Sequence, residues 1–177
     1  MQQNMVVTQK ECPARRVPTG QKTTIPAGQF ISINQDLGGN YTVTWQGNMM
    51  RIDGTDAAAI GREPEQLVFA QNNTDQIDSD QVWQAIKSVF DPEIPVNLAD
   101  LGLIYAVDVD QQTKSANIKM TLTAPGCGMG PILVGDVEYR VALVPNVETV
   151  NVALVFDPPW HKDMMSEEAQ LETGLFF

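Results

Sequence analysis

The feature that most constrains the fold is a strict alternation of apolar and polar side chains over residues 116–123. The apolar positions are Ala116, Ile118, Met120 and Leu122, and the polar positions are Asn117, Lys119, Thr121 and Thr123. Because successive side chains of a strand point to opposite faces, this period of two predicts a β-strand with one buried and one solvated face. Such a half-buried strand is typical of antiparallel pairing, so we expect antiparallel neighbours.

A loop of small and ring-constrained residues follows this strand and contains one cysteine, Cys127. The loop reads Ala124-Pro125-Gly126-Cys127-Gly128-Met129-Gly130-Pro131. Pro131 suits the first position of a helix, where no backbone N–H is needed. The apolar residues that follow recur with helical spacing, which predicts a helix whose buried face comprises Leu133, Val137, Val141 and Val144.

This predicted helix would direct its unpaired N–H groups and the positive end of its dipole at Cys127. That setting favours the thiolate, which is the form of cysteine that attacks electrophiles and binds soft metals. We therefore interpret Cys127 as a functional thiol. The alternative is a cysteine that packs as a small buried hydrophobic residue.

The glycines of the loop suggest that an anion could rest on free backbone N–H groups. The residues expected at this loop site are Thr123, Gly126, Gly128 and Gly130. A dinucleotide-binding site is excluded, because Pro131 occupies the place of the third glycine in that fingerprint and the preceding strand alternates.

His161 and Asp100 are further candidates for a metal site with Cys127. His161 follows another predicted strand and could serve as a base or co-ligand if the two strands are neighbours; otherwise it is a solvated side chain. Asp100 lies among apolar residues, where a carboxylate needs a hydrogen-bonding task, so it could cap the loop or bind a hard metal.

The rest of residues 77–177 predicts an α+β domain. A helix from Asp78 to Phe90 is expected to bury Val82, Ile86 and Val89, and strands are expected over 103–109 and 150–156. A short helix should begin at Ser166. The order is then helix, two strands, helix, strand, helix, which fits one sheet covered by helices on one side.

Residues 1–73 predict a small β-rich domain with a flexible N-terminal tail. Alternating stretches indicate strands over 29–33, 41–45 and 49–52, which would form an antiparallel sheet or barrel. Residues 62–78 are typical of a connector, in which 67–69 could still form a strand. We expect Cys12 in a mobile region and find no catalytic grouping in this half.

Composition excludes several classes of protein. The formal net charge of −11 repels phosphate backbones, so no nucleic acid is expected as a partner. The sequence shows no apolar run long enough to cross a bilayer and no secretory signal, which predicts a cytoplasmic protein without a membrane partner. Two cysteines and one histidine supply neither a disulfide framework nor a four-ligand zinc site.

Four separated blocks of sequence resemble the metal–sulfur cluster biosynthesis family that includes PaaD and SufT. The blocks are Asp91-Pro92-Glu93-Ile94-Pro95-Val96-Asn97, Asp100-Leu101-Gly102-Leu103-Ile104-Tyr105, Thr121-Leu122-Thr123-Ala124-Pro125-Gly126-Cys127 and Asp157-Pro158-Pro159-Trp160. The resemblance spans about residues 77–177, and the preceding half is similar to the N-terminal extension of longer SufT-type proteins. One departure is Gly128, where family members often carry proline.

The resemblance implies an iron–sulfur assembly fold and an accessory, non-enzymatic role in maturing iron–sulfur proteins, with Cys127 as the functional residue. A stable cluster usually needs four thiolates, and one chain offers two at most. We therefore expect transient handling of iron or a cluster, with iron–sulfur scaffold, carrier or client proteins as partners. A homodimer could bring two copies of Cys127 together. The alternatives are a thiol-dependent enzyme or redox sensor with Cys127 as nucleophile, and a pure interaction module.

Overall fold

The computed structural model describes residues 4–92, 94–124 and 128–174 of the chain. The chain divides into two compact units, residues 1–67 and residues 68–177, and we describe each by itself. Within the described residues, no helix has both the length and the apolar character that crossing a membrane requires.

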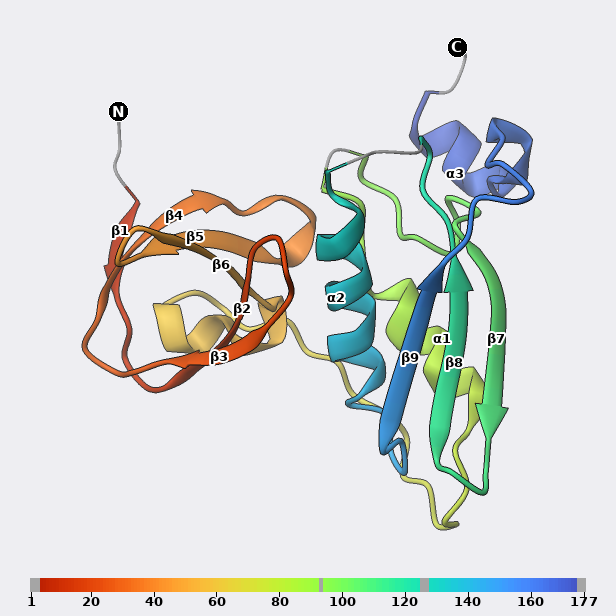
Figure 1. The fold of residues 1–177 in the computed structure, drawn as a ribbon, viewed down its shortest axis with the longest axis horizontal. Coiled ribbons are helices and arrows are strands. Elements are labelled where there is room, and N and C mark those ends of the chain that lie inside the picture. Colours follow the sequence, from red (N-terminus) through yellow and green to blue (C-terminus); the bar gives the residue numbers. More distant parts are fainter. Residues whose placement is uncertain (1–3, 93, 125–127, 175–177) are drawn as a thin grey trace. The chain divides into compact units, whose positions relative to one another are not determined.

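The first unit is built on a six-stranded antiparallel sheet in the order β1-β4-β5-β6-β2-β3 (Figure 1). Its elements are β1 (Met5–Val7), β2 (Cys12–Arg16), β3 (Lys22–Ile25), β4 (Phe30–Gln35), η1 (Leu37–Gly39), β5 (Tyr41–Trp45), β6 (Asn48–Ile52) and η2 (Gly54–Ile60). The predicted strands correspond to β4, β5 and β6, whereas β1 to β3 and the two short helices were not predicted. The alternation of β5 is confirmed, since Val43 is buried while Tyr41 and Trp45 pack against the same core.

Cys12 corrects one expectation, because it does not lie in a mobile segment. It begins β2, pairs with Ile25 across the sheet and has no exposed surface. Burial, with a smaller effect of the Asp56 carboxylate, raises the pKa of the Cys12 thiol to about 12. Cys12 is therefore a neutral packing residue at physiological pH.

The second unit is α+β, as expected, and its helices and strands follow the predicted order. Its elements are α1 (Ser79–Lys87), β7 (Ile104–Asp110), β8 (Ser115–Met120), α2 (Gly130–Val141), β9 (Thr149–Leu154), η3 (Lys162–Met164) and α3 (Glu167–Glu172). The helices begin where the sequence predicts: Asp78 caps α1 and Ser166 caps α3 through side-chain oxygens that accept backbone N–H groups.

The sheet of this unit has the order β7-β8-β9, with β8 in the centre. β8 is antiparallel to β7 but parallel to β9, so the expectation of antiparallel neighbours is wrong on one side. The alternation of β8 itself is confirmed, since Ile118 and Met120 are buried and Lys119 is exposed. Alternation reports that only one face of the sheet is covered, and it does not report the direction of the neighbouring strand.

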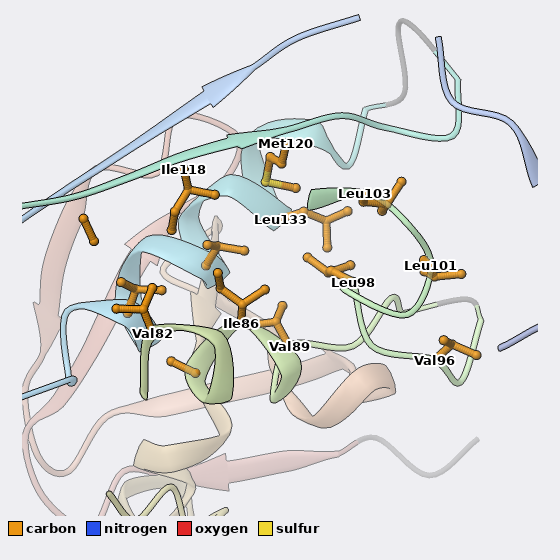
Figure 2. Packing of buried hydrophobic residues seen from close by; sticks show 14 of the residues in the cluster. Val82, Ile86, Val89, Val96, Leu98, Leu101, Leu103, Ile118, Met120 and Leu133 are labelled. Carbon is orange, nitrogen blue, oxygen red and sulfur yellow. The ribbon is translucent and has the colours of Figure 1, made fainter. Parts of the chain in front are cut away.

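The covered face of this sheet packs against α1, α2 and the loop between α1 and β7 (Figure 2). The labelled side chains of this core are Val82, Ile86, Val89, Val96, Leu98, Leu101, Leu103, Ile118, Met120 and Leu133. The buried face predicted for α2 is confirmed. Helix α1 ends at Lys87, earlier than expected, and Phe90 instead forms an isolated bridge with Asn97.

Residues 67–69 form no strand, and the connector from Val68 onward belongs to the second unit. Side-chain amides bind its backbone: Gln84 Nε2 donates to Val68 O at 2.7 Å and Gln81 Nε2 donates to Ala70 O at 2.8 Å. Asn146 Nδ2 donates to the carbonyls of Thr74 and Gln76 farther along. These bonds replace the strand pairing that the segment lacks.

Three hydrogen bonds attach the segment after β9 to the residues just before and at the start of β7. Trp160 Nε1 donates to Leu101 O at 2.7 Å, Tyr105 Oη donates to Pro158 O at 2.7 Å, and the Ser166 N–H donates to Asp100 O at 2.9 Å. This close approach depends on Gly102, whose φ is +78° and whose missing Cβ leaves room for the Met164 carbonyl.

We expect Gly102→Ala to destabilise the second unit by about 2–4 kcal/mol, because alanine is strained at positive φ and its Cβ would overlap the Met164 carbonyl oxygen. Urea unfolding followed by tryptophan fluorescence measures this loss. Gly174→Ala is the matched control, since Gly174 also has positive φ but no neighbour within 4 Å. A loss of only about 1 kcal/mol for both variants would mean that the close approach of Met164 to Gly102 does not add to the cost of the substitution.

We expect the Cys12 thiol to resist alkylation in the folded protein and to react once the first unit unfolds, because its pKa is raised to about 12. Because the pKa of this thiol is higher in the folded than in the unfolded protein, the fold is most stable below the pKa of the unfolded thiol. As the pH rises above about 9, the free energy of unfolding decreases by at most about 1.4 kcal/mol per pH unit.

Denaturant unfolding across this pH range, comparing Cys127→Ser with Cys127→Ser/Cys12→Ala, measures the difference that Cys12 makes. Equal pH dependence in both proteins, or rapid alkylation of folded Cys127→Ser, would contradict the neutral buried thiol.

Candidate functional site

The parallel pairing of β8 and β9 brings the ends of both strands to one edge of the sheet. Met120 at the end of β8 is paired with Leu154 at the end of β9, and the Val155 N–H donates to Met120 O at 2.8 Å. The start of β7 lies at the same edge, since Ile104 is opposite Met120. The ends of β8 and β9 and the start of β7 therefore lie at one edge of the sheet (Figure 1).

Cys127, Gly126 and Pro125 lie outside the described residues, so the site is defined by the residues on either side. Ala124 and Gly128, which flank these three residues, are both exposed. The start of α2 follows at once, and no side chain at the N-cap position, Met129, accepts a hydrogen bond from the helix. The helix begins at Gly130, one residue before the predicted start, so Pro131 lies in its first turn.

Gly130 lets the start of α2 come close to the end of β8. It is buried, and a Cβ at this position would lie 2.9 Å from Leu122 Cδ1. A larger residue would have to displace Leu122, so glycine is explained here by packing. Gly128 differs, because a Cβ there would meet nothing within 4 Å. Of the predicted loop residues, Thr123 is exposed and borders the hollow described next.

A small hollow of about 80 Å³ lies beside the loop. Its lining residues are Asp91, Pro92, Ile94, Leu103, Leu122, Thr123, Met129 and Leu133. They come from four separated segments, and most are apolar. The Asp91 carboxylate is fixed at the rim, since Asp91 Oδ1 accepts the Ile94 N–H at 3.0 Å. Sequence reasoning missed Met129 and Leu133 as site residues: it placed Met129 in the loop and assigned Leu133 to the buried face of the helix.

His161 follows β9, and the expectation that its strand neighbours the strand before Cys127 is confirmed. Its imidazole Nδ1 accepts the Asp163 N–H and lies 3.2 Å from Asp163 Oδ2, with 63% of the His161 side chain exposed. The histidine thus begins the short helix η3 and has Asp163 as its described partner.

Asp100 is held by Asn97, because Asn97 Nδ2 donates to Asp100 Oδ2 at 2.7 Å and the Asp100 N–H donates to Asn97 Oδ1 at 2.9 Å. It borders a second hollow, which also includes Phe90 and Glu168. Neither His161 nor Asp100 lines the hollow beside the loop. Their assignment as metal ligands stays a prediction.

Among the described residues, no group of three or more His, Cys, Asp or Glu side chains is placed to hold a metal ion. The thiol of Cys12 belongs to the other unit and is buried. The described geometry therefore offers a helix N-terminus with an apolar hollow beside it. Such a hollow can receive an apolar group from another molecule.

Comparison with known proteins places this site in a family. The family model described as iron-sulfur cluster assembly protein matches residues 79–153, within the second unit. An Fe-S protein maturation auxiliary factor of Porphyromonas gingivalis is 47% identical over 95 residues, which cover 54% of this chain and 90% of the relative. The auxiliary factor SufT of Staphylococcus aureus is 40% identical over 87 residues, which cover 49% of this chain and 98% of the relative.

Two solved structures agree on the fold. A domain of unknown function from Bacillus anthracis is 36% identical with a TM-score of 0.51, and it covers 54% of this chain and 91% of that domain. A conserved hypothetical protein from Thermotoga maritima is 31% identical with a TM-score of 0.51, covering 58% of this chain and 99% of that protein. The chain belongs to the iron–sulfur cluster assembly protein family.

Proposed function

We propose that this protein is an accessory factor in the maturation of iron–sulfur proteins and that Cys127 is its working residue. The observation that supports this most directly is the position of the Cys127 loop, which joins the end of β8 to the uncapped start of α2 in a family of assembly proteins. The relatives are named maturation auxiliary factors, which favours a role without catalytic turnover.

The helix supports a reactive state for the thiol. Within the described residues the N-cap Met129 makes no side-chain cap. First-turn N–H groups and the positive end of the helix dipole stabilise an adjacent negative charge. A cysteine thiolate in the loop would therefore be favoured over the neutral thiol. That thiolate is the form needed to bind ferrous iron or an exposed iron of a cluster.

The cysteine count supports transient rather than permanent binding of iron. The chain has two cysteines, and the thiol of Cys12 is buried with its pKa raised to about 12. One thiolate per chain supplies a quarter of the ligands that a cluster usually has. Iron or a cluster bound here is thus cargo that shares its remaining ligands with scaffold, carrier or client proteins, and a free thiol in such use fits the reducing cytoplasm.

The hollow beside the loop provides a place for a partner. Its mostly apolar lining, with Asp91 at the rim, suits one aliphatic side chain from a protein that presents or receives the cargo. The second unit has five basic and sixteen acidic residues, so partners with a basic surface are favoured and nucleic acid is disfavoured.

We expect Cys127→Ser to abolish client maturation in cells that lack the wild-type protein, because serine is close to cysteine in size but is a poor ligand for iron. The measurement is the activity of an iron–sulfur client enzyme, normalised to its protein level. The matched control is Cys12→Ala, which removes the other sulfur and should keep client activity if the unit folds.

Anaerobic incubation of the purified proteins with ferrous iron and sulfide separates binding from docking. In an equilibrium titration, wild type and Cys12→Ala should bind iron, and Cys127→Ser should bind about tenfold less. Equal iron content and equal client activity for Cys127→Ser and wild type would remove Cys127 from the mechanism. Client maturation lost with iron content unchanged would instead assign Cys127 to contact with the partner.

A further inference from the structure

Strand β1 lies at one end of the six-stranded sheet and, within the described part of the chain, pairs with β4 alone. The carbonyl of Asn4 accepts the Ile33 N–H and the Thr8 N–H donates to Gln29 O, so the backbone of even-numbered residues faces β4. Antiparallel strands direct the backbone groups of successive residues to opposite sides. The N–H and C=O groups of Met5 and Val7 therefore point away from the sheet.

This edge has one of the features that usually limit pairing between molecules, a short length. Edge strands of soluble proteins are normally protected by being very short or by a charge, a proline or a bulge. β1 contains only Met5, Val6 and Val7, so it has no charge or proline, and its register with β4 is regular. The outward N–H and C=O groups of Met5 and Val7 therefore remain open to a short strand of another molecule.

The outer face at this edge is apolar and exposed. Met5 is 52% exposed, Val7 is 43% exposed, and Phe30, directly opposite Val7 on β4, is 70% exposed. We call these three side chains the β1 patch. Aromatic and methionine side chains are enriched at the centre of protein interfaces. A groove of about 600 Å³, lined by residues 6–9 and 60–62 and so including Arg62, lies against the same strand.

We infer that β1 of one copy pairs antiparallel with β1 of a second copy, so that the first unit forms a homodimer. A twofold axis at Val6 would place Met5 of one copy opposite Val7 of the other on the same face. Their outward N–H and C=O groups would then form four hydrogen bonds, and the two β1 patches would become one continuous surface. The strand is thus complementary to itself.

The distribution of charge favours a second copy as the occupant. Residues 1–67 contain six basic and six acidic residues, so this unit is neutral and does not repel its own copy. Residues 68–177 contain five basic and sixteen acidic residues and carry the whole net charge of −11. The net charge of the second unit therefore opposes self-association through that unit, whereas the neutral first unit does not repel its own copy.

Sedimentation of the full chain, without an N-terminal tag, tests the inference over a dilution series. Val7→Pro removes an outward N–H from each copy while keeping every bond to β4, so the dimer Kd should rise about tenfold or more. Val7→Thr is the matched control, because threonine keeps the N–H and the branched shape, and its Kd should stay near that of wild type.

A second pair of variants tests the side chains without changing the backbone. Phe30→Lys places like charges on the continuous surface and should weaken the dimer, whereas Val68→Lys changes an equally exposed residue of the other unit and should not. Circular dichroism checks that each variant is folded. A monomeric wild type, a dimer indifferent to Val7→Pro and Phe30→Lys, or an edge that binds only an extended peptide from another protein would overturn the inference.

Discussion

The parallel pairing of β8 with β9 is the constraint on which the rest of the second unit depends. Two parallel strands that are consecutive in a sheet need a crossover connection, and here α2 supplies it. The chain must leave β8 at one edge and return through α2 to start β9 at the opposite edge. The chain therefore leaves β8 toward α2 at the carboxyl edge of the sheet, and the N-terminus of α2 lies at that edge, where Gly130 approaches Leu122.

The four sequence blocks that resemble the family have distinct physical tasks around this edge. Asp91 fixes its own turn through the Ile94 N–H, Asn97 and Asp100 bind each other, and Trp160 donates to Leu101 O. These bonds fix the backbone of three of the four blocks at this edge. Exposed residues occur in two of the blocks: Thr123 and Ala124 in the loop block, and Asp157, Pro158 and Pro159 in the last block. The motif thus combines side chains that hold the backbone in place with segments that are open to other molecules.

Much of this fold could be predicted from local signals. Asp78 and Ser166 mark helix starts because their side chains cap N–H groups, and the alternation of β5 and β8 reports one covered face. β2 could not be predicted in this way, since it buries Arg15 beside Ala14 and so breaks the period of two. The direction of β9 was also beyond reach, because alternation is the same for parallel and antiparallel neighbours when one face is open.

The hollow beside the loop could not be predicted for a different reason. Its lining comes from four segments that meet only through tertiary packing, and residues such as Leu103 and Leu133 satisfy the pattern of an ordinary core equally well. Cys12 is a second case in which tertiary packing could not be predicted from the sequence. The sequence singled out Cys127 by its loop, but it placed Cys12 in a mobile region, and only the structure shows that the Cys12 thiol is buried.

The burial of Cys12 bears directly on how a factor with this fold could handle iron. Affinity for a cluster grows with the number of thiolates that bind it, and release to a client requires that the client offer more ligands than the donor. A chain with one available thiolate binds weakly by itself and gains affinity only in company with a partner's ligands. Under the proposed function, burying Cys12 in a separate unit keeps the second sulfur from converting a transfer site into a storage site. Because the chain offers so few ligands, transfer of iron or a cluster to a client with more ligands lowers the free energy.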